Sequence, residues 1–329
     1  MHSLVRAYPT EARLFLVLLA ITAFLSFASP SFLTLGNVAS LLNNNAVNLI
    51  WAVGLLVVLI SGGIDISFAV AASVVQYICF YAFAAIGGGN WLFGFLLAGL
   101  IGAAIGFVNA ALIHYFRIIS IIVTIATFNA LFGLLMFITS GRFIYDLPDW
   151  WTNRIVVLHL PATGGDAELI LPVAVMLAAM AITWILVRYT TTGRQLYAFG
   201  DNPEGARRAG VSAAWMRFIA FGWMGMMAGV GGLMQVNIVQ EVVPNALIGR
   251  ELDVLAAVVL GGARLGGGRG SVFGCFLGVL LVAITQNGLN LLGVSPFAFK
   301  MVIGVIILFA ISMSNLDFTR LARAVGGSR

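Results

Sequence analysis

Long apolar runs separated by short polar stretches fill almost the whole of this 329-residue chain. Lipid offers the backbone no hydrogen-bond partners, so runs of this length are helices or barrel strands, and the ten-residue alternation of barrel strands is absent. A helix of ~20 residues crosses the hydrocarbon core. The pattern therefore predicts an all-α polytopic membrane protein with helices at 13–30, 38–60, 64–86, 91–114, 118–139, 169–188, 216–238, 251–263, 271–292 and 297–314.

These runs predict about ten transmembrane helices. The eighth, 251–263, is short and is expected to be partly re-entrant. No linker or low-complexity segment divides the chain, so we expect one transmembrane domain over residues 1–329.

The basic residues predict the orientation. With the N-terminus in the cytosol, only four of the 17 basic residues fall on the outer side, namely Arg142, Arg154, Arg250 and Lys300. Cytosolic loops are enriched in Lys and Arg, so this orientation is favoured, and an even number of spans returns the C-terminus to the cytosol. The net charge of +5 follows from the same bias and requires no nucleic-acid partner.

Composition excludes most enzyme chemistry. Hydrophobic residues make up 61% of the chain and charged residues 9%, against roughly 25% charged residues in soluble domains. The single lysine, Lys300, is followed by Met301, so a G-x-x-x-x-G-K-[ST] phosphate loop is impossible. H-E-x-x-H and G-x-S-x-G are absent, Cys79 and Cys275 lie in apolar runs, and the three histidines are far apart. We therefore expect no catalytic residue and no metal site.

One long polar segment, Thr190–Arg217, separates the sixth and seventh spans. Within it the sequence EGARRA predicts a short cytosolic helix, with Asn202 or Asp201 as N-cap, Pro203 at the first position and Gly210 after the end. Such a helix is too short to be stable alone. The segment is interpreted as a docking site for a cytosolic partner, and the alternative is a positively charged anchor on the cytosolic side.

A single acidic residue, Asp65, lies between two apolar runs in Ser61–Ser67, SGGIDIS. At the edge of the bilayer its carboxylate is placed to cap the following helix. The other interpretations are a contact to a partner or gating element, and a proton or ion site.

Neutral amide and hydroxyl side chains recur within the predicted spans. Such groups are costly in lipid, so they face other helices or a water-filled path. A path of this kind suits a neutral polyhydroxylated or amide-bearing solute, whereas the alternative is hydrogen bonding between helices. The candidate pathway residues are Asn44, Asn48, Gln76, Asn129, Gln235, Gln286 and Asn287.

The longest predicted outer loop, Ser140–Glu168, contains Trp150 and Trp151. These side chains are typical of an anchor at the membrane surface, either as an interfacial belt or as a short flat helix. A docking surface for an external partner is the alternative.

Three segments resemble the permease subunits of the ribose- and galactose-type sugar ABC importers of bacteria. Ser61–Ser67 is similar to that family's SGGIDLSVG. Gly193–Gly210, GRQLYAFGDNPEGARRAG, is similar to its cytosolic coupling segment, and Glu251–Pro296 is similar to its C-terminal stretch. The resemblance covers nearly the whole chain. Phe68 and Ala69 stand where the family usually has valine and glycine, and Ile119 or Ser120 stands where it usually has proline.

The resemblance implies a permease in the bacterial inner membrane that pairs with an identical or related permease, with the pathway at their interface. It implies a cytosolic ATPase that binds ATP and Mg and receives the coupling helix, and a periplasmic binding protein that delivers the solute. This chain itself is expected to bind no cofactor. By the same match, the residues in contact with the ATPase are Gly200, Asp201, Asn202, Glu204, Arg207, Arg208 and Gly210.

Two other functions remain open from the sequence. A secondary transporter of a small polar solute commonly needs intramembrane charge or broken helices, and Asp65 is the weak candidate for such a charge. An intramembrane enzyme needs a nucleophile and a base, for which no constellation is found. The identity of the solute is also left open.

Overall fold

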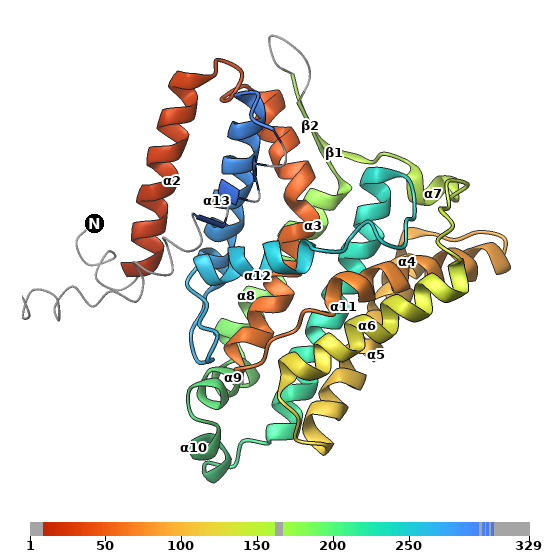
Figure 1. Ribbon diagram of the computed structural model, residues 1–329, viewed down its shortest axis with the longest axis vertical. Helices are drawn as coiled ribbons and strands as arrows, with labels where there is room; N and C mark the ends of the chain where they lie inside the picture. Colours follow the sequence, from red (N-terminus) through yellow and green to blue (C-terminus); the bar gives the residue numbers. More distant parts are fainter. Residues whose placement is uncertain (1–8, 162–166, 296–297, 300, 303, 306–329) are drawn as a thin grey trace, which may run out of the picture.

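The computed structural model describes residues 9–161, 167–295, 298–299, 301–302 and 304–305. Helices dominate this part of the chain (Figure 1). They are α2 (Pro9–Ala28), α3 (Leu35–Ile60), α4 (Phe68–Ala85), α5 (Trp91–Tyr115), α6 (Ser120–Thr139), α7 (Asp149–Thr152), α8 (Leu171–Tyr189), α9 (Thr191–Asp201), α10 (Pro203–Arg208), α11 (Ala213–Val239), α12 (Arg250–Leu260) and α13 (Val272–Leu291).

Eight helices in the described part are long and apolar enough to cross a membrane: α2, α3, α4, α5, α6, α8, α11 and α13. They correspond to predicted spans one to seven and nine. The eighth predicted span, 251–263, contains α12, which has only 11 residues and is too short to cross. Most of the tenth predicted span, 297–314, and the two termini lie outside the described residues.

A β-hairpin corrects the purely helical prediction. Strand β1 (Val156–Leu160) pairs antiparallel with β2 (Ala167–Ile170), and β2 leads directly into α8. The two strands were not predicted because they lie in or beside the predicted outer loop. A search for long apolar runs does not detect a hairpin with strands of four and five residues.

Several helices begin at a polar residue that satisfies a first-turn N–H group. The side chains of Thr34, Asn90, Ser212 and Ser271 accept hydrogen bonds from the backbone three residues on, at the starts of α3, α5, α11 and α13. First-turn N–H groups have no partner within the helix, so these caps fix where each span starts.

Helix α3 forms the centre of the protein. Every residue from Ala46 to Ile60 is buried except Asn48. Helices α13 and α2 lie on one side of α3 in Figure 1, and α11 lies on the other, followed by α4, α5 and α6. Because α3 is apolar around its whole circumference from Leu49 to Ile60, it is the helix least able to leave its neighbours.

Helices α5 and α11 cross with their backbones in close contact. Gly102 and Gly106 on α5 face Gly225 and Gly229 on α11, so each helix presents a G-x-x-x-G pair. A Cβ atom on Gly102 would overlap the carbonyl group of Gly225, and one on Gly225 would overlap the carbonyl group of Gly102. Small residues permit this approach in membranes, where packing rather than the hydrophobic effect holds helices together.

We predict that Gly102→Ala lowers the melting temperature in detergent, because the helices must separate, at about 1–3 kcal/mol for overpacking. Gly99→Ala is the matched control on the same buried face, since its Cβ would meet only the Met226 side chain at an ordinary 3.5 Å. That control should be neutral or stabilising by up to ~1 kcal/mol through helix propensity. Equal melting temperatures for the two variants would contradict the close crossing.

Candidate functional site

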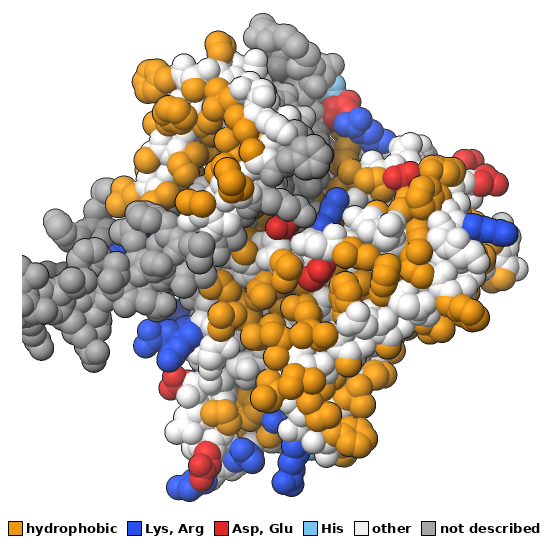
Figure 2. All heavy atoms as spheres, viewed as in Figure 1, with side chains coloured by type: hydrophobic (Ala, Val, Ile, Leu, Met, Phe, Trp, Pro, Cys, Tyr) orange, Lys and Arg blue, Asp and Glu red, His pale blue; other side chains and the backbone are white. Residues whose placement is uncertain are grey.

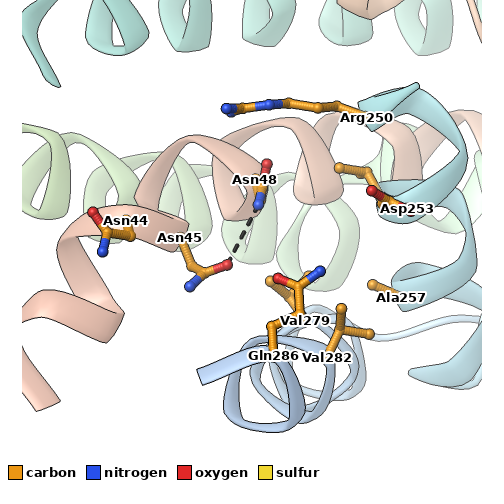
Figure 3. Close-up of a pocket in the computed structure, with 10 residues that line it drawn as sticks. Asn44, Asn45, Asn48, Arg250, Asp253, Ala257, Val279, Val282 and Gln286 are labelled. Atoms are coloured by element: carbon orange, nitrogen blue, oxygen red, sulfur yellow. Dashed lines mark hydrogen bonds between the residues drawn. The ribbon is translucent and has the colours of Figure 1, made fainter. Parts of the chain in front are cut away.

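A cavity of about 280 Å³ opens between α3, α12 and α13. Figure 3 shows amides from α3 and α13 and two charged side chains from α12 around one space. The lining residues are Asn44, Asn45, Asn48, Arg250, Asp253, Val254, Ala257, Val279, Val282 and Gln286.

Asn48 is the centre of the α3 wall. Its Nδ2 atom donates to Oδ1 of Asn45 at 3.4 Å, whereas its own Oδ1 is buried without a hydrogen-bond partner in the described structure. A buried carbonyl oxygen without a partner costs roughly 1–3 kcal/mol. Because Asn48 lines the cavity, rotation of its amide would present this acceptor to a donor that enters.

Helix α12 contributes the charged wall. It starts after Gly249, whose φ of 91° lies in the left-handed region, and the Glu251 carboxylate accepts the Gly249 N–H at 2.9 Å. Arg250 Nη1 donates to Oε1 of Gln235 on α11 at 3.0 Å, which holds the guanidinium beside the cavity. Asp253 lines the same cavity, one turn along.

Sequence reasoning missed this charged pair. It placed Arg250 on the outer side, where it counted only toward orientation, and gave Asp253 no role. The signal was present, because charged residues at the start of an apolar run are costly in a membrane and are usually functional.

The structure brings together three of the seven predicted pathway residues: Asn44, Asn48 and Gln286 line the cavity. Gln235 reaches it indirectly, through Arg250. The interhelical alternative fits two others, because Gln76 donates to the Gly232 carbonyl and Asn287 exchanges two hydrogen bonds of 2.9 Å with Asn37. Asn129 is exposed and donates to Ile125 of its own helix.

The three segments that carry the family resemblance meet at the end of α3. The Ile60 carbonyl, at the C-terminus of α3, accepts the Gly268 N–H at 2.9 Å. A Cβ on Gly200, at the end of α9, would overlap that same carbonyl and the Gly268 nitrogen. The Tyr197 hydroxyl on α9 also donates to the Gly270 carbonyl at 2.7 Å. We call this contact of Ile60, Gly200 and Gly268 the glycine junction.

The glycine-rich run 261–270 makes close backbone contact with α9. Gly267 and Gly268 have φ of 87° and 74°, and side chains at these positions would collide with Gly200 and Asp201 respectively. Glycine is required here both for the left-handed backbone and for the close approach.

The polar segment 190–217 contains two helices, of which one was predicted. Asn202 caps α10 by accepting the Gly205 N–H at 2.9 Å, Pro203 begins the helix, and Gly210 follows its end with φ of 87°. Helix α9 was missed, although Thr190 caps it, because the glycines at 193 and 200 weakened the helical pattern.

Exposed charges mark the end of the molecule that carries α10, at the bottom of Figures 1 and 2. Asp201, Asn202, Glu204, Arg207 and Arg208 are exposed, and Arg208 pairs with Glu204 on the same helix. Gly200 is buried in the glycine junction, so it belongs to the support of this surface and not to the surface itself.

Asp65 does not occupy the helix-cap position predicted for it. Helix α4 begins at Phe68, and Asp65 Oδ1 instead accepts the Ser67 N–H at 2.8 Å and the Ser67 hydroxyl at 2.7 Å. The Ser67 Oγ atom accepts from Asn109 on α5, whose Oδ1 accepts from Thr127 on α6. Burial raises the pKa of the Asp65 carboxyl above its usual value, and the Ser67 hydrogen bonds act in the opposite direction.

The outer loop is hydrogen-bonded to the helices beneath it. Trp151 is fully buried and donates to the Leu233 carbonyl at 2.9 Å, so it does not form an interfacial belt. Asn237 donates to the Trp151 carbonyl at 2.7 Å. Asn43, next to the cavity residue Asn44, donates to the Glu168 carbonyl and accepts from the Ile170 N–H. The loop therefore holds both α11 and α3.

Comparison with known proteins gives one consistent family. The sequence model of the family described as the branched-chain amino acid transport system permease component matches residues 37–311. The ribose import permease protein of Escherichia coli (strain K12) is 32% identical over 318 residues, 94% of this chain and 95% of that protein.

Two further relatives are named for other solutes. The galactose/methyl galactoside import permease protein of Salmonella typhimurium is 27% identical over 320 residues, 94% of this chain and 95% of that protein. The autoinducer 2 import system permease protein of Photorhabdus luminescens is 30% identical over 298 residues, 91% and 87% of the two chains. No solved structure gives a significant match.

We predict that Asp65→Asn is milder than Asp65→Leu. Asparagine keeps an oxygen at the Oδ1 position, whereas leucine leaves the Ser67 N–H and hydroxyl buried without that acceptor, at roughly 1–3 kcal/mol. Melting temperature in detergent measures the difference. Equal losses in both variants would show that the negative charge, and not the acceptor geometry, holds the loop.

Proposed function

This chain belongs to the family of permease components of sugar-importing ABC transporters, and we propose that it forms the translocation pathway for a neutral sugar or sugar-like solute. Its relatives are transport components and not enzymes. The observation that carries the proposal is the cavity lined by amides together with Arg250 and Asp253, because hydroxyl groups both donate and accept hydrogen bonds.

The proposed pathway lies between two permease subunits, identical or related, in the bacterial inner membrane. Figure 2 shows acidic and basic side chains in the middle of an otherwise largely apolar face, the face on which α12 lies in Figure 1. Charge at that position is costly against lipid. A second permease that covers this face would replace the lipid and enclose the cavity.

The energy for transport is proposed to come from another chain. Permease components of ABC importers work with an ATPase and a periplasmic binding protein. The sequence of this chain has no phosphate-loop lysine, so ATP and Mg belong to the partner ATPase. We place the ATPase at α10 and the binding protein on the outer loop, at the opposite end of the molecule in Figure 1.

The test of this function is uptake into proteoliposomes that contain the permease, the ATPase and the binding protein. We expect uptake of D-ribose, D-galactose or autoinducer 2 that requires ATP and survives an uncoupler. Uptake that an uncoupler abolishes while ATP is maintained would instead identify a secondary transporter.

A second candidate solute is an amino acid. The family description names branched-chain amino acids. The carboxylate of an amino acid could pair with Arg250 and its ammonium group with Asp253, which both line the cavity. The relatives above carry the names of ribose, galactoside and autoinducer 2 importers, and the amides supply hydrogen bonds that a branched apolar side chain cannot use. L-leucine uptake by the same proteoliposomes distinguishes the two.

We predict that Asn48→Leu and Gln286→Leu each lower uptake per assembled complex, because each removes an amide at the cavity, at about 0.5–1.5 kcal/mol. Asn129→Leu is the matched control, since its amide is exposed and bonded to its own helix. The control should transport normally. If both cavity variants also transport normally, the pathway runs along other faces.

We predict that Arg207→Glu with Arg208→Glu weakens co-purification with the ATPase and solute-stimulated ATP hydrolysis. Charge reversal at a partner interface costs several kcal/mol. Asn202 and buried Ala206 still hold α10 in place, so the chain should remain folded. Arg142→Glu with Arg154→Glu makes the same change of charge on the outer side and should leave co-purification with the ATPase intact. Wild-type docking by the α10 variant would remove the proposed contact.

A further inference from the structure

The charged pair on α12 offers the cavity both kinds of hydrogen-bonding group. A guanidinium carries five N–H donors and a carboxylate only acceptors. Arg250 donates one hydrogen bond to Gln235, which fixes the direction of the guanidinium and leaves its other N–H groups for a solute. Asp253 lines the same space from the same helix, and Figure 3 shows both side chains projecting from α12 on the side of α3.

The opposite wall requires a donor. Asn48 lines the cavity, and its Oδ1 is buried without a partner among the described residues, so rotation of the amide toward an occupant that donates a hydrogen bond would satisfy it. An apolar group placed there would leave the oxygen unpaired, at roughly 1–3 kcal/mol. An occupant that donates to Asn48 and both donates and accepts at α12 has several hydroxyl groups.

The size of the cavity limits the occupant further. Its volume of about 280 Å³ lies just below the roughly 300–1,000 Å³ typical of small-molecule sites. One sugar ring is therefore favoured over an oligosaccharide.

We propose that Arg250 and Asp253 are the specificity-determining residues of this cavity, and that they select a neutral monosaccharide over its carboxylate counterpart. The inference rests on the proposed function. Asp253 accepts from sugar hydroxyls and repels an anionic solute, while Arg250, held by Gln235, donates to hydroxyl or ring oxygens. Without the carboxylate of Asp253, the same arginine would attract an anion.

Saturation-transfer NMR on the purified permease in detergent tests the proposal without the binding protein. The probes are D-ribose, D-galactose, the aldonates D-ribonate and D-galactonate, and L-leucine. The variants are Asp253→Asn, Asp253→Ser, Asp253→Glu and Arg250→Gln. Arg154→Gln is the control, because it removes a basic side chain on the outer loop, where Arg154 pairs with Glu168. Melting temperatures identify any variant that fails to fold. Two neutral replacements of Asp253 are included so that the test still stands if one of them does not fold.

We expect the wild type to bind an aldose and not its aldonate. Asp253→Asn and Asp253→Ser should raise the aldonate-to-aldose signal ratio at least ~10-fold, since like-charge repulsion is removed. Asp253→Glu should preserve discrimination, Arg250→Gln should weaken the aldose signal without admitting the aldonate, and Arg154→Gln should match the wild type.

An unchanged ratio in both neutral variants of Asp253 would overturn the proposal, as would preferential binding of L-leucine. No aldose signal from a wild-type sample that supports ATP-dependent uptake once reconstituted would also overturn it, and would leave the permease function standing. If the reconstituted wild type shows no ATP-dependent uptake at all, that separate result would count against the proposed function.

Discussion

The rest of the structure depends on one backbone contact, the glycine junction of Ile60, Gly200 and Gly268. Three segments distant in sequence approach here without intervening side chains, and the Gly268 N–H bonds to the last carbonyl of α3. Helix ends leave carbonyl groups unsatisfied, so the loop after α12 completes α3 while α9 packs against both. A methyl group added at Gly200 would overlap both Ile60 and Gly268 and push the three segments apart.

The junction joins the two ends of the proposed transport system. Below it, α9 continues into α10, the surface proposed for the ATPase. Above it, α3 carries Asn48 and the loop 261–271 leads back to α12, so two walls of the cavity start from the same contact. This continuity identifies the atoms through which movement of α10 would reach Asn48 and Arg250.

Local rules were sufficient for features that depend on neighbouring residues. Apolar runs predicted all eight candidate spans in the described part, and the Asn202–Pro203 pair predicted α10. Features set by distant contacts could not be predicted in this way. Helix α9 is held by the junction in spite of its glycines, and Trp151 is buried by α11 and not by lipid. The pairs Asn37–Asn287 and Gln76–Gly232 look the same in sequence as cavity amides, because only the fold decides which face of a helix meets another helix.

The most direct test of this account is the amount of solute imported per ATP hydrolysed by complexes that carry Gly200→Ala or Gly266→Ala. A Cβ on Gly200 would overlap Ile60, whereas one on Gly266 in the neighbouring loop would meet only Arg264, at 3.8 Å. We expect Gly200→Ala to import ~10-fold less solute per ATP, a loss typical of coupling free energies. Gly266→Ala should match the wild type. Normal import per ATP by a folded Gly200→Ala complex would contradict the claim that the glycine junction links the ATPase surface to the cavity.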